Sequence, residues 1–207
     1  PEVRRVPFPS SAEMVRVGST PSNRRLIINA DDYGLSRGVN TGIIEAADAG
    51  AVTSTSMIVN LPAFSDAVAR AASRPALSVG LHLNLTTGKP LTAAPSLIRR
   101  KTGHFYSLPV LMTRASFGLI DSSDVTQECA AQLDRLFEFG NSHTQLDSHR
   151  HVHAHPALWS AVIASAFSRA VSYVRVPVEP MSPTRRAGRA ARPADRLLAL
   201  PPPPPLP

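Results

Sequence analysis

The sequence of 207 residues has a single cysteine, Cys129, and aromatic residues make up only 5% of it. One cysteine cannot form a disulfide within the chain, so small secreted scaffolds held by disulfides are excluded and a reducing compartment is favoured. No apolar run approaches the roughly 18 residues that span a bilayer, and the N-terminus lacks a continuous apolar segment of the signal-peptide type. These absences predict a soluble, cytoplasmic protein without a transmembrane segment.

Charged residues are also scarce, at 18% of the chain, yet the formal net charge is +7. The excess lies at the two ends. Residues 1–25 hold five arginines against two glutamates, and residues 181–207 hold five arginines against one aspartate. Because the body between these ends is neutral, we expect no basic face that binds nucleic acid specifically, although a basic tail could bind polyanions without specificity.

Proline is concentrated in the basic C-terminal end of the chain, since ten of the 20 prolines fall between Pro177 and Pro207. Such a composition predicts a disordered Arg/Pro-rich tail over residues 181–207, or alternatively a ligand for a proline-recognising module. Residues 1–23 lack periodicity and are expected to be irregular. The 43% of hydrophobic residues is enough to form a core, so one domain is predicted over residues 24–180.

Within this domain, apolar runs rich in β-formers alternate with segments of helical period, which is typical of βα units and a parallel sheet. Strands are expected at 26–28, 52–59, 77–85, 144–149 and 171–176, and helices at 38–49, from 62, at 123–139 and from 156. Residues 86–121 are expected to be a long irregular loop of the kind that lines a site. We predict an α/β fold, either a barrel or an open sheet.

Three polar clusters lie where parallel strands end, which is where reactive side chains collect in such folds. The first contains Asp31 and Asp32, whose adjacent carboxylates repel each other unless a cation compensates; the alternative is that they cap the next helix. The second contains His82 and Asn84, which alternation places on one face of a strand. Taken alone, His82 could equally be a hydrogen-bonded core histidine.

The third cluster is the richest, because residues 149–155 hold four of the seven histidines of the chain. Histidines at every second position share one face of an extended segment, so several imidazoles are expected to point at one volume. The alternative is a surface tract of histidines. Together the three clusters offer a carboxylate and two imidazoles, a set that suits Zn²⁺ or another divalent first-row ion, whereas Mg²⁺ would prefer more oxygen.

Four segments carry a resemblance to a known family: LIINADDYGLSRGVN at 26–40, GAVTSTSMIVN at 50–60, VGLHLNLTTGKPL at 79–91 and LDSHRHVHAHP at 146–156. In this order they resemble the ChbG/HpnK (YdjC-like) carbohydrate deacetylases, and the resemblance extends from Arg25 to Pro180. It implies a (β/α) barrel-like fold, distorted and incomplete relative to the eight-stranded form. It also implies metal-dependent removal of acetyl groups from N-acetylated sugars such as chitooligosaccharides.

The resemblance assigns roles to individual residues. Asp32, His82 and His149 match the positions that bind one divalent metal ion, either Mg²⁺ or Zn²⁺, and Asp31 matches the general base. His151 and His153 fall on positions that support the ligands or contact the substrate, and Asn84 is placed with them. The implied partner is an acetylated oligosaccharide or glycolipid.

The sequence departs from the family after Pro180. Related chains continue, with a His-Pro-Gly segment that looks like the source of a further catalytic histidine, whereas this chain has no histidine beyond His155. We therefore expect a C-terminally truncated member whose source of the general acid is open and whose activity is impaired.

Several alternatives follow from the same residues. The chain could be a non-catalytic metal- or sugar-binding remnant of the family. The same ligand set could also cleave a phosphoester or another amide, because the ligands alone do not choose the bond. A barrel with missing strands would expose apolar edges, which predicts a homo-oligomer.

Overall fold

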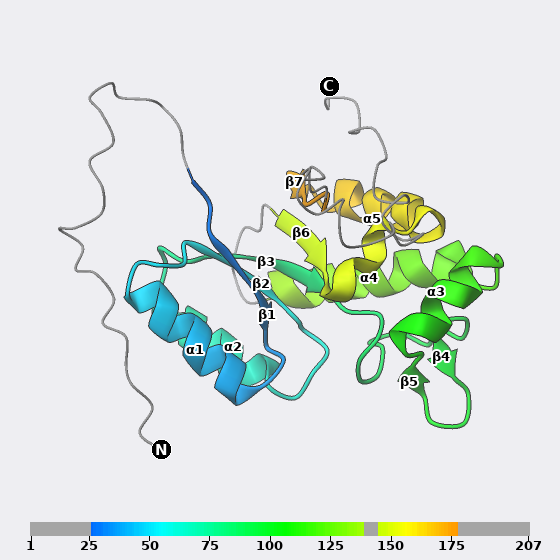
Figure 1. Ribbon diagram of the computed structural model, residues 1–207, viewed down its shortest axis with the longest axis horizontal. Helices are drawn as coiled ribbons and strands as arrows, with labels where there is room; N and C mark the ends of the chain where they lie inside the picture. Colours follow the sequence, from blue (N-terminus) through cyan, green and yellow to red (C-terminus); the bar gives the residue numbers. More distant parts are fainter. Residues whose placement is uncertain (1–25, 139–144, 178–207) are drawn as a thin grey trace, which may run out of the picture.

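A computed structural model describes residues 26–138 and 145–177 of the chain (Figure 1). The predicted N-terminal segment 1–23, the predicted Arg/Pro-rich tail 181–207 and the last residue of the helix predicted at 123–139 lie outside the described residues. No helix within the described ranges is both long enough and apolar enough to cross a bilayer.

Strands and helices alternate along the chain as the sequence predicts. The main sheet consists of β1 (Asn29–Tyr33), β2 (Ser54–Met57), β3 (Ser78–Leu83), β6 (Gln145–Ser148) and β7 (Tyr173–Val174). The helices that connect its strands are α1 (Arg37–Asp48), α2 (Phe64–Ala71), α4 (Ser122–Phe137) and α5 (Pro156–Ser168). The long connection after β3 holds β4 (Ile98–Arg99), β5 (His104–Phe105) and α3 (Leu108–Ser116), and the short 3₁₀ helix η1 (His149–Ala154) follows β6.

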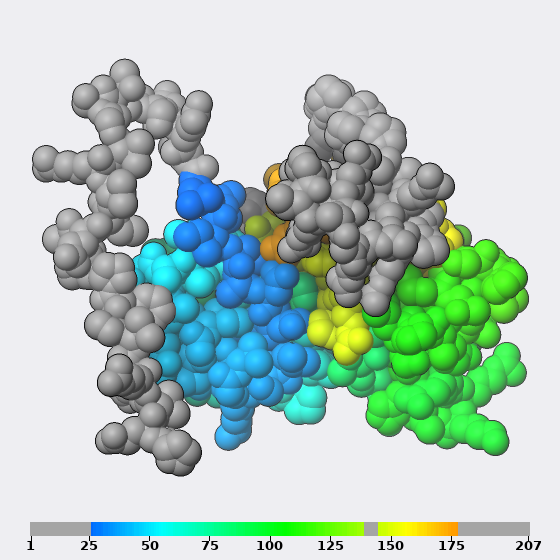
Figure 2. Space-filling view, in the orientation of Figure 1, coloured from blue at the N-terminus to red at the C-terminus, as the bar shows by residue number. Residues whose placement is uncertain are grey.

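The order of strands in the sheet, β1-β2-β3-β6-β7, is also their order in the chain, and every neighbouring pair is parallel. Parallel strands are joined by right-handed crossovers, so an order that never reverses places the connecting helices on one face of the sheet. This is the arrangement of a barrel wall, whereas the order of a doubly wound sheet reverses at its centre. The predicted α/β class is confirmed, and over the described residues the sheet is open. Figures 1 and 2 show α1 and α2 at one end of the molecule and α3 with the β4–β5 pair at the other.

The two faces of the sheet differ in polarity because successive side chains of a strand point to opposite faces. One set is apolar and belongs to the buried core with the helices; it includes Met57, Val79, Leu81, Leu83 and Leu146. The alternate set is polar and hydrogen-bonded across the strands; it includes Asn29, Ser54, Ser56, His82, Gln145 and Asp147. The first face therefore packs in the core and stabilises the fold, while the second face presents the polar side chains that can take part in a reaction.

Two predicted segments differ from the structure. The strand expected at 26–28 is wrong: Leu26 and Ile27 are 79% and 69% exposed, and the strand begins at Asn29. The loop expected over 86–121 contains β4, β5 and α3. It is ordered by buried polar groups of α4 that periodicity does not reveal.

The anchoring groups of α4 bind the main chain of this long connection. Glu128 is fully buried and its carboxylate accepts the backbone N–H groups of Leu91 and Thr92 at 2.9–3.1 Å. Asp124, one helical turn earlier, accepts the backbone N–H of Ser96 at 2.7 Å. Buried backbone groups need partners, and these carboxylates supply partners that no sheet ladder provides there.

A prediction for stability follows from Gly80 on β3. A Cβ at this position would lie 2.1 Å from Cγ of Gln145 and 2.6 Å from its carbonyl oxygen, so Gly80→Ala is expected to lower the free energy of unfolding by about 1–3 kcal/mol. Gly42 in α1 is the matched control, because its Cβ would meet nothing within 4 Å. Gly42→Ala is expected to raise the same quantity by about 0.5–1 kcal/mol. Denaturant unfolding measures both, and an unchanged midpoint for Gly80→Ala would contradict the close contact.

Candidate metal centre

The end of β1 brings two adjacent carboxylates to the same side of the sheet. Neighbouring residues of a regular strand point to opposite faces, but the register between β1 and β2 shifts between Ala30 and Tyr33. Asp32 adopts a left-handed conformation there, with φ of 68°, which aspartate tolerates better than most residues. The irregularity re-aims the side chain, as bulges beside functional sites do. The carboxylates of Asp31 and Asp32 therefore both point into the candidate site.

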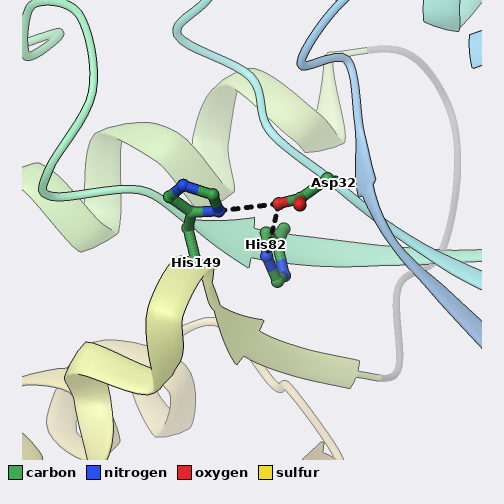
Figure 3. A group of neighbouring side chains, drawn as sticks. All are labelled: Asp32, His82 and His149. Atoms are coloured by element: carbon green, nitrogen blue, oxygen red, sulfur yellow. Dashed lines mark hydrogen bonds and ion pairs between the residues drawn. The ribbon is translucent and has the colours of Figure 1, made fainter. Parts of the chain in front are cut away.

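Two imidazoles from separate elements approach the carboxylate of Asp32 (Figure 3). Oδ1 of Asp32 lies 2.7 Å from Nδ1 of His149, at the start of η1, and 3.1 Å from Nε2 of His82, on β3. These ligand atoms all lie within 4.8 Å of one another. The hydrogen bonds from His149 and His82 hold the pKa of Asp32 well below its usual range.

Asp147 on β6 holds the His82 ring through the ring nitrogen that faces away from Asp32. The register pairs the two residues across β3 and β6, and Nδ1 of His82 lies 2.6 Å from Oδ1 of Asp147. Ser56 Oγ lies 3.2 Å from the same nitrogen and donates to Oδ2 of Asp147 at 3.1 Å. Burial lowers the pKa of His82, but hydrogen bonds to Asp147 and Asp32 outweigh it and raise the pKa to about 9. The site thus favours positive charge, and a carboxylate behind a metal-binding histidine is the usual means of orienting its ring.

Asp31 is bound by a guanidinium. The two terminal nitrogens of Arg175, which follows β7, donate to Oδ2 and Oδ1 of Asp31, each at 2.9 Å, and Asn29 donates to Oδ1 at 2.8 Å. Burial raises the pKa of Asp31, but Arg175 and Asn29 outweigh it and hold the pKa below its usual range. The Asp31 carboxylate is therefore ionised at neutral pH, and its side chain is 37% exposed.

The predicted extended run of histidines is wrong. Residues 149–154 form η1, and Arg150 and His151 have positive φ values of 59° and 54°, so the alternation on which the prediction depends is broken. His149 alone of the four histidines reaches Asp32. His151 is exposed, and His155 caps α5 by accepting the backbone N–H of Ala157.

His153 supports the site from within the fold. It is fully buried, and burial lowers its pKa, so the ring is neutral. Nε2 donates to the carbonyl of Arg175 at 2.7 Å, while Ser148 Oγ contacts Nδ1. A carbonyl only accepts, so the ring proton lies on Nε2 and Nδ1 accepts from the Ser148 hydroxyl.

Asn84 lies just after β3 and is also fully buried. Its side-chain amide donates to Asn60 and to the carbonyl of Thr87, and accepts the backbone N–H groups of Thr86 and Thr87. These four hydrogen bonds use the whole capacity of the amide. Asn84 therefore shapes the turn after β3.

The three residues around Asp32 fit a divalent cation. Metal–ligand bonds of about 2.0–2.1 Å place neighbouring ligands of one ion roughly 3–3.5 Å apart, near the 3.1 and 2.7 Å that separate His82 and His149 from Asp32. The orientation of the His82 ring also fits, because Nδ1 contacts Asp147 and Nε2 is directed at Asp32. The chemistry of two imidazoles and one carboxylate favours zinc-like ions over Mg²⁺.

Residues 25–201 match the family model described as YdjC-like protein. The chain belongs to the YdjC-like family. A carbohydrate deacetylase of Geobacillus stearothermophilus is 40% identical to this YdjC-like chain over 162 residues, which are 78% of the chain and 62% of that relative. A solved structure from Enterococcus faecalis V583, described provisionally as a cellobiose-phosphate cleavage protein, shares 33% identity with a TM-score of 0.66, covering 73% of this chain and 59% of the other. The YdjC-like chain thus spans about three fifths of the length of each.

Sequence reasoning missed two important site residues of the YdjC-like chain, Asp147 and Arg175. Asp147 precedes His149 by two residues, so strand alternation could have placed it beside the site. Arg175 is the one charged residue in the predicted strand 171–176, and a charge in a mostly apolar strand points to a specific partner. Its partner, Asp31, could not be found this way, because the pair depends on the order of strands in the sheet.

Proposed function

We propose that this chain is a metal-dependent hydrolase that removes acetyl groups from N-acetylated sugars, of the chitooligosaccharide type or a related glycan or glycolipid. One observation carries the proposal: Asp32, His82 and His149 converge on one point, with the ionised carboxylate of Asp31 beside them. The relative named a carbohydrate deacetylase supports the choice of substrate.

Asp32, His82 and His149 would hold one divalent cation, Zn²⁺ or Mg²⁺. When bound, such an ion supplies a Lewis acid that polarises an amide carbonyl and lowers the pKa of water. Asp147 and Ser56 keep the His82 ring in place for this task. Three protein ligands leave positions open for water and substrate, as catalytic centres require.

Asp31 is the proposed general base. In the reaction, water adds to the acetyl carbon and the carbon–nitrogen bond breaks as the nitrogen takes up the proton that the water loses, so that acetate and a free amino group on the sugar result. Asp31 accepts the proton that the attacking water loses, for which it must be ionised and accessible. Its lowered pKa and 37% exposed side chain support both conditions.

The remaining assignments are also proposals. His151, exposed and two residues from His149, is proposed to contact the sugar, while His153 and Asn84 are proposed to hold the surrounding backbone in place. The cytoplasmic location stays a prediction. Self-association of the chain also stays a prediction, and the exposed side chains of Leu26 and Ile27 beside β1 support it.

The test is acetate release from N-acetylglucosamine oligomers by the purified chain. We expect turnover that disappears after a chelator removes the metal and returns when Zn²⁺ or Mg²⁺ is added. The amino group formed on the sugar is measured in parallel and should equal the acetate. Metal binding without acetate release would instead support the non-catalytic remnant. Acetate release that persists after treatment with the chelator would overturn the metal-dependent mechanism.

A further inference from the structure

A second group of potential metal ligands adjoins the first. Ligand atoms of Asp31, His82 and Asp147 also lie within 4.8 Å of one another. His82 belongs to both groups, with Nε2 directed at Asp32 and Nδ1 at Asp147. By proximity alone, the centre could hold two cations, as many hydrolytic sites do.

A guanidinium already contacts both carboxylates of this second group. Arg175 binds both oxygens of Asp31 at 2.9 Å, and one of the same nitrogens lies 3.0 Å from Oδ2 of Asp147. Arginine stays protonated in proteins and its planar fork matches a carboxylate, so its charge is permanent and directed. The two carboxylates share one built-in cation.

Arg175 is held in this position from both sides. Its backbone N–H donates to the carbonyl of Leu146 at 2.9 Å, which continues the pairing of β6 with β7. Its carbonyl accepts Nε2 of the buried His153 at 2.7 Å. Only 26% of the Arg175 side chain is exposed. The guanidinium is therefore part of the fold at this place.

We propose that Arg175 is a positioning residue that keeps the centre mononuclear: by occupying the space between Asp31 and Asp147, it prevents a second divalent cation from binding there. Asp31 is thereby kept from becoming a metal ligand and remains available to accept a proton. This inference rests on the proposed function, because it takes Asp32, His82 and His149 as the site of the one cation.

The experiment counts bound Mn²⁺ ions, by calorimetry and by electron paramagnetic resonance, which detects coupling between neighbouring Mn²⁺ ions. We expect one Mn²⁺ per wild-type chain and two per chain of Arg175→Ala. Arg175→Lys, which retains a positive charge, should remain at one. Asp147→Asn in the Arg175→Ala background removes a ligand of the second group and should restore one.

The outcomes separate this inference from the proposed function. A wild-type chain that binds no Mn²⁺ would contradict the metal centre itself. A wild-type chain that binds one, with one also in Arg175→Ala, would leave the centre intact and overturn the inference. A wild-type chain that binds two would overturn the inference without any variant. If circular dichroism shows that Arg175→Ala does not fold, Arg175→Met, which keeps the aliphatic part of the side chain, takes its place under the same criterion.

Discussion

Replacing Asp31 with asparagine is expected to lower the rate of acetate release by about 10²- to 10⁴-fold while the metal stays bound. Asparagine is nearly the same size as aspartate, so it can keep the hydrogen bond to Arg175 through its amide oxygen. It cannot accept the proton of the attacking water. Acetate release and metal content of the same Asp31→Asn sample measure the two effects.

Asp134→Asn is the matched control for this variant. Asp134 also binds a guanidinium through both oxygens, that of Arg169 at 2.6 and 2.7 Å, but it lies on the surface of α4 with its side chain 57% exposed. Turnover of Asp134→Asn should equal that of the wild type. Loss of metal from Asp31→Asn would show that Asp31 is a ligand, and unchanged turnover would show that the base is another group.

Replacing His82 with alanine is expected to weaken metal binding by more than about 100-fold, and turnover should fall with it. The loss of a residue that only supports a ligand already costs about 10- to 100-fold in affinity. His82→Ala removes a ligand and also leaves the Asp147 carboxylate, with its side chain 5% exposed, without its 2.6 Å partner. Calorimetric titration with Zn²⁺ measures the affinity.

His104→Ala is the control for the loss of a histidine as such. His104 lies in β5, where Nδ1 contacts the carbonyl of Thr102 at 3.0 Å, so its replacement should leave the affinity unchanged. Asp147→Asn provides an intermediate case, expected to weaken binding by about 10- to 100-fold. An unaltered affinity in His82→Ala, with native circular dichroism, would exclude His82 as a ligand.

The fold class and the convergence of polar strand ends could be predicted because they depend on periodicity and on a general property of parallel sheets. Asp32, His82 and His149 each lie at or directly after the carboxyl end of a strand, and the parallel strands of one sheet all end at the same edge. These residues alone allow cleavage of several kinds of bond, and the family resemblance favours deacetylation among them.

What could not be predicted depends on local backbone conformation and on long-range pairing. The left-handed backbone conformation of Asp32 directs two neighbouring carboxylates to one side. The left-handed conformations of Arg150 and His151 direct the side chains of the histidine run to different sides. Arg175 and Asp31 are 144 residues apart in the chain, so their contact requires the sheet order to be known. Periodicity contains neither kind of information.

The way α4 anchors the long connection after β3 has an evolutionary consequence. Glu128 and Asp124 bind amide hydrogens of the main chain at Leu91, Thr92 and Ser96, and every residue except proline provides such a hydrogen. The exposed side chains of this connection can therefore diversify while its path is preserved, whereas Leu97, Phe105 and Leu111 belong to the buried core. Relatives could acquire new specificities there by substitution, with the helix unchanged.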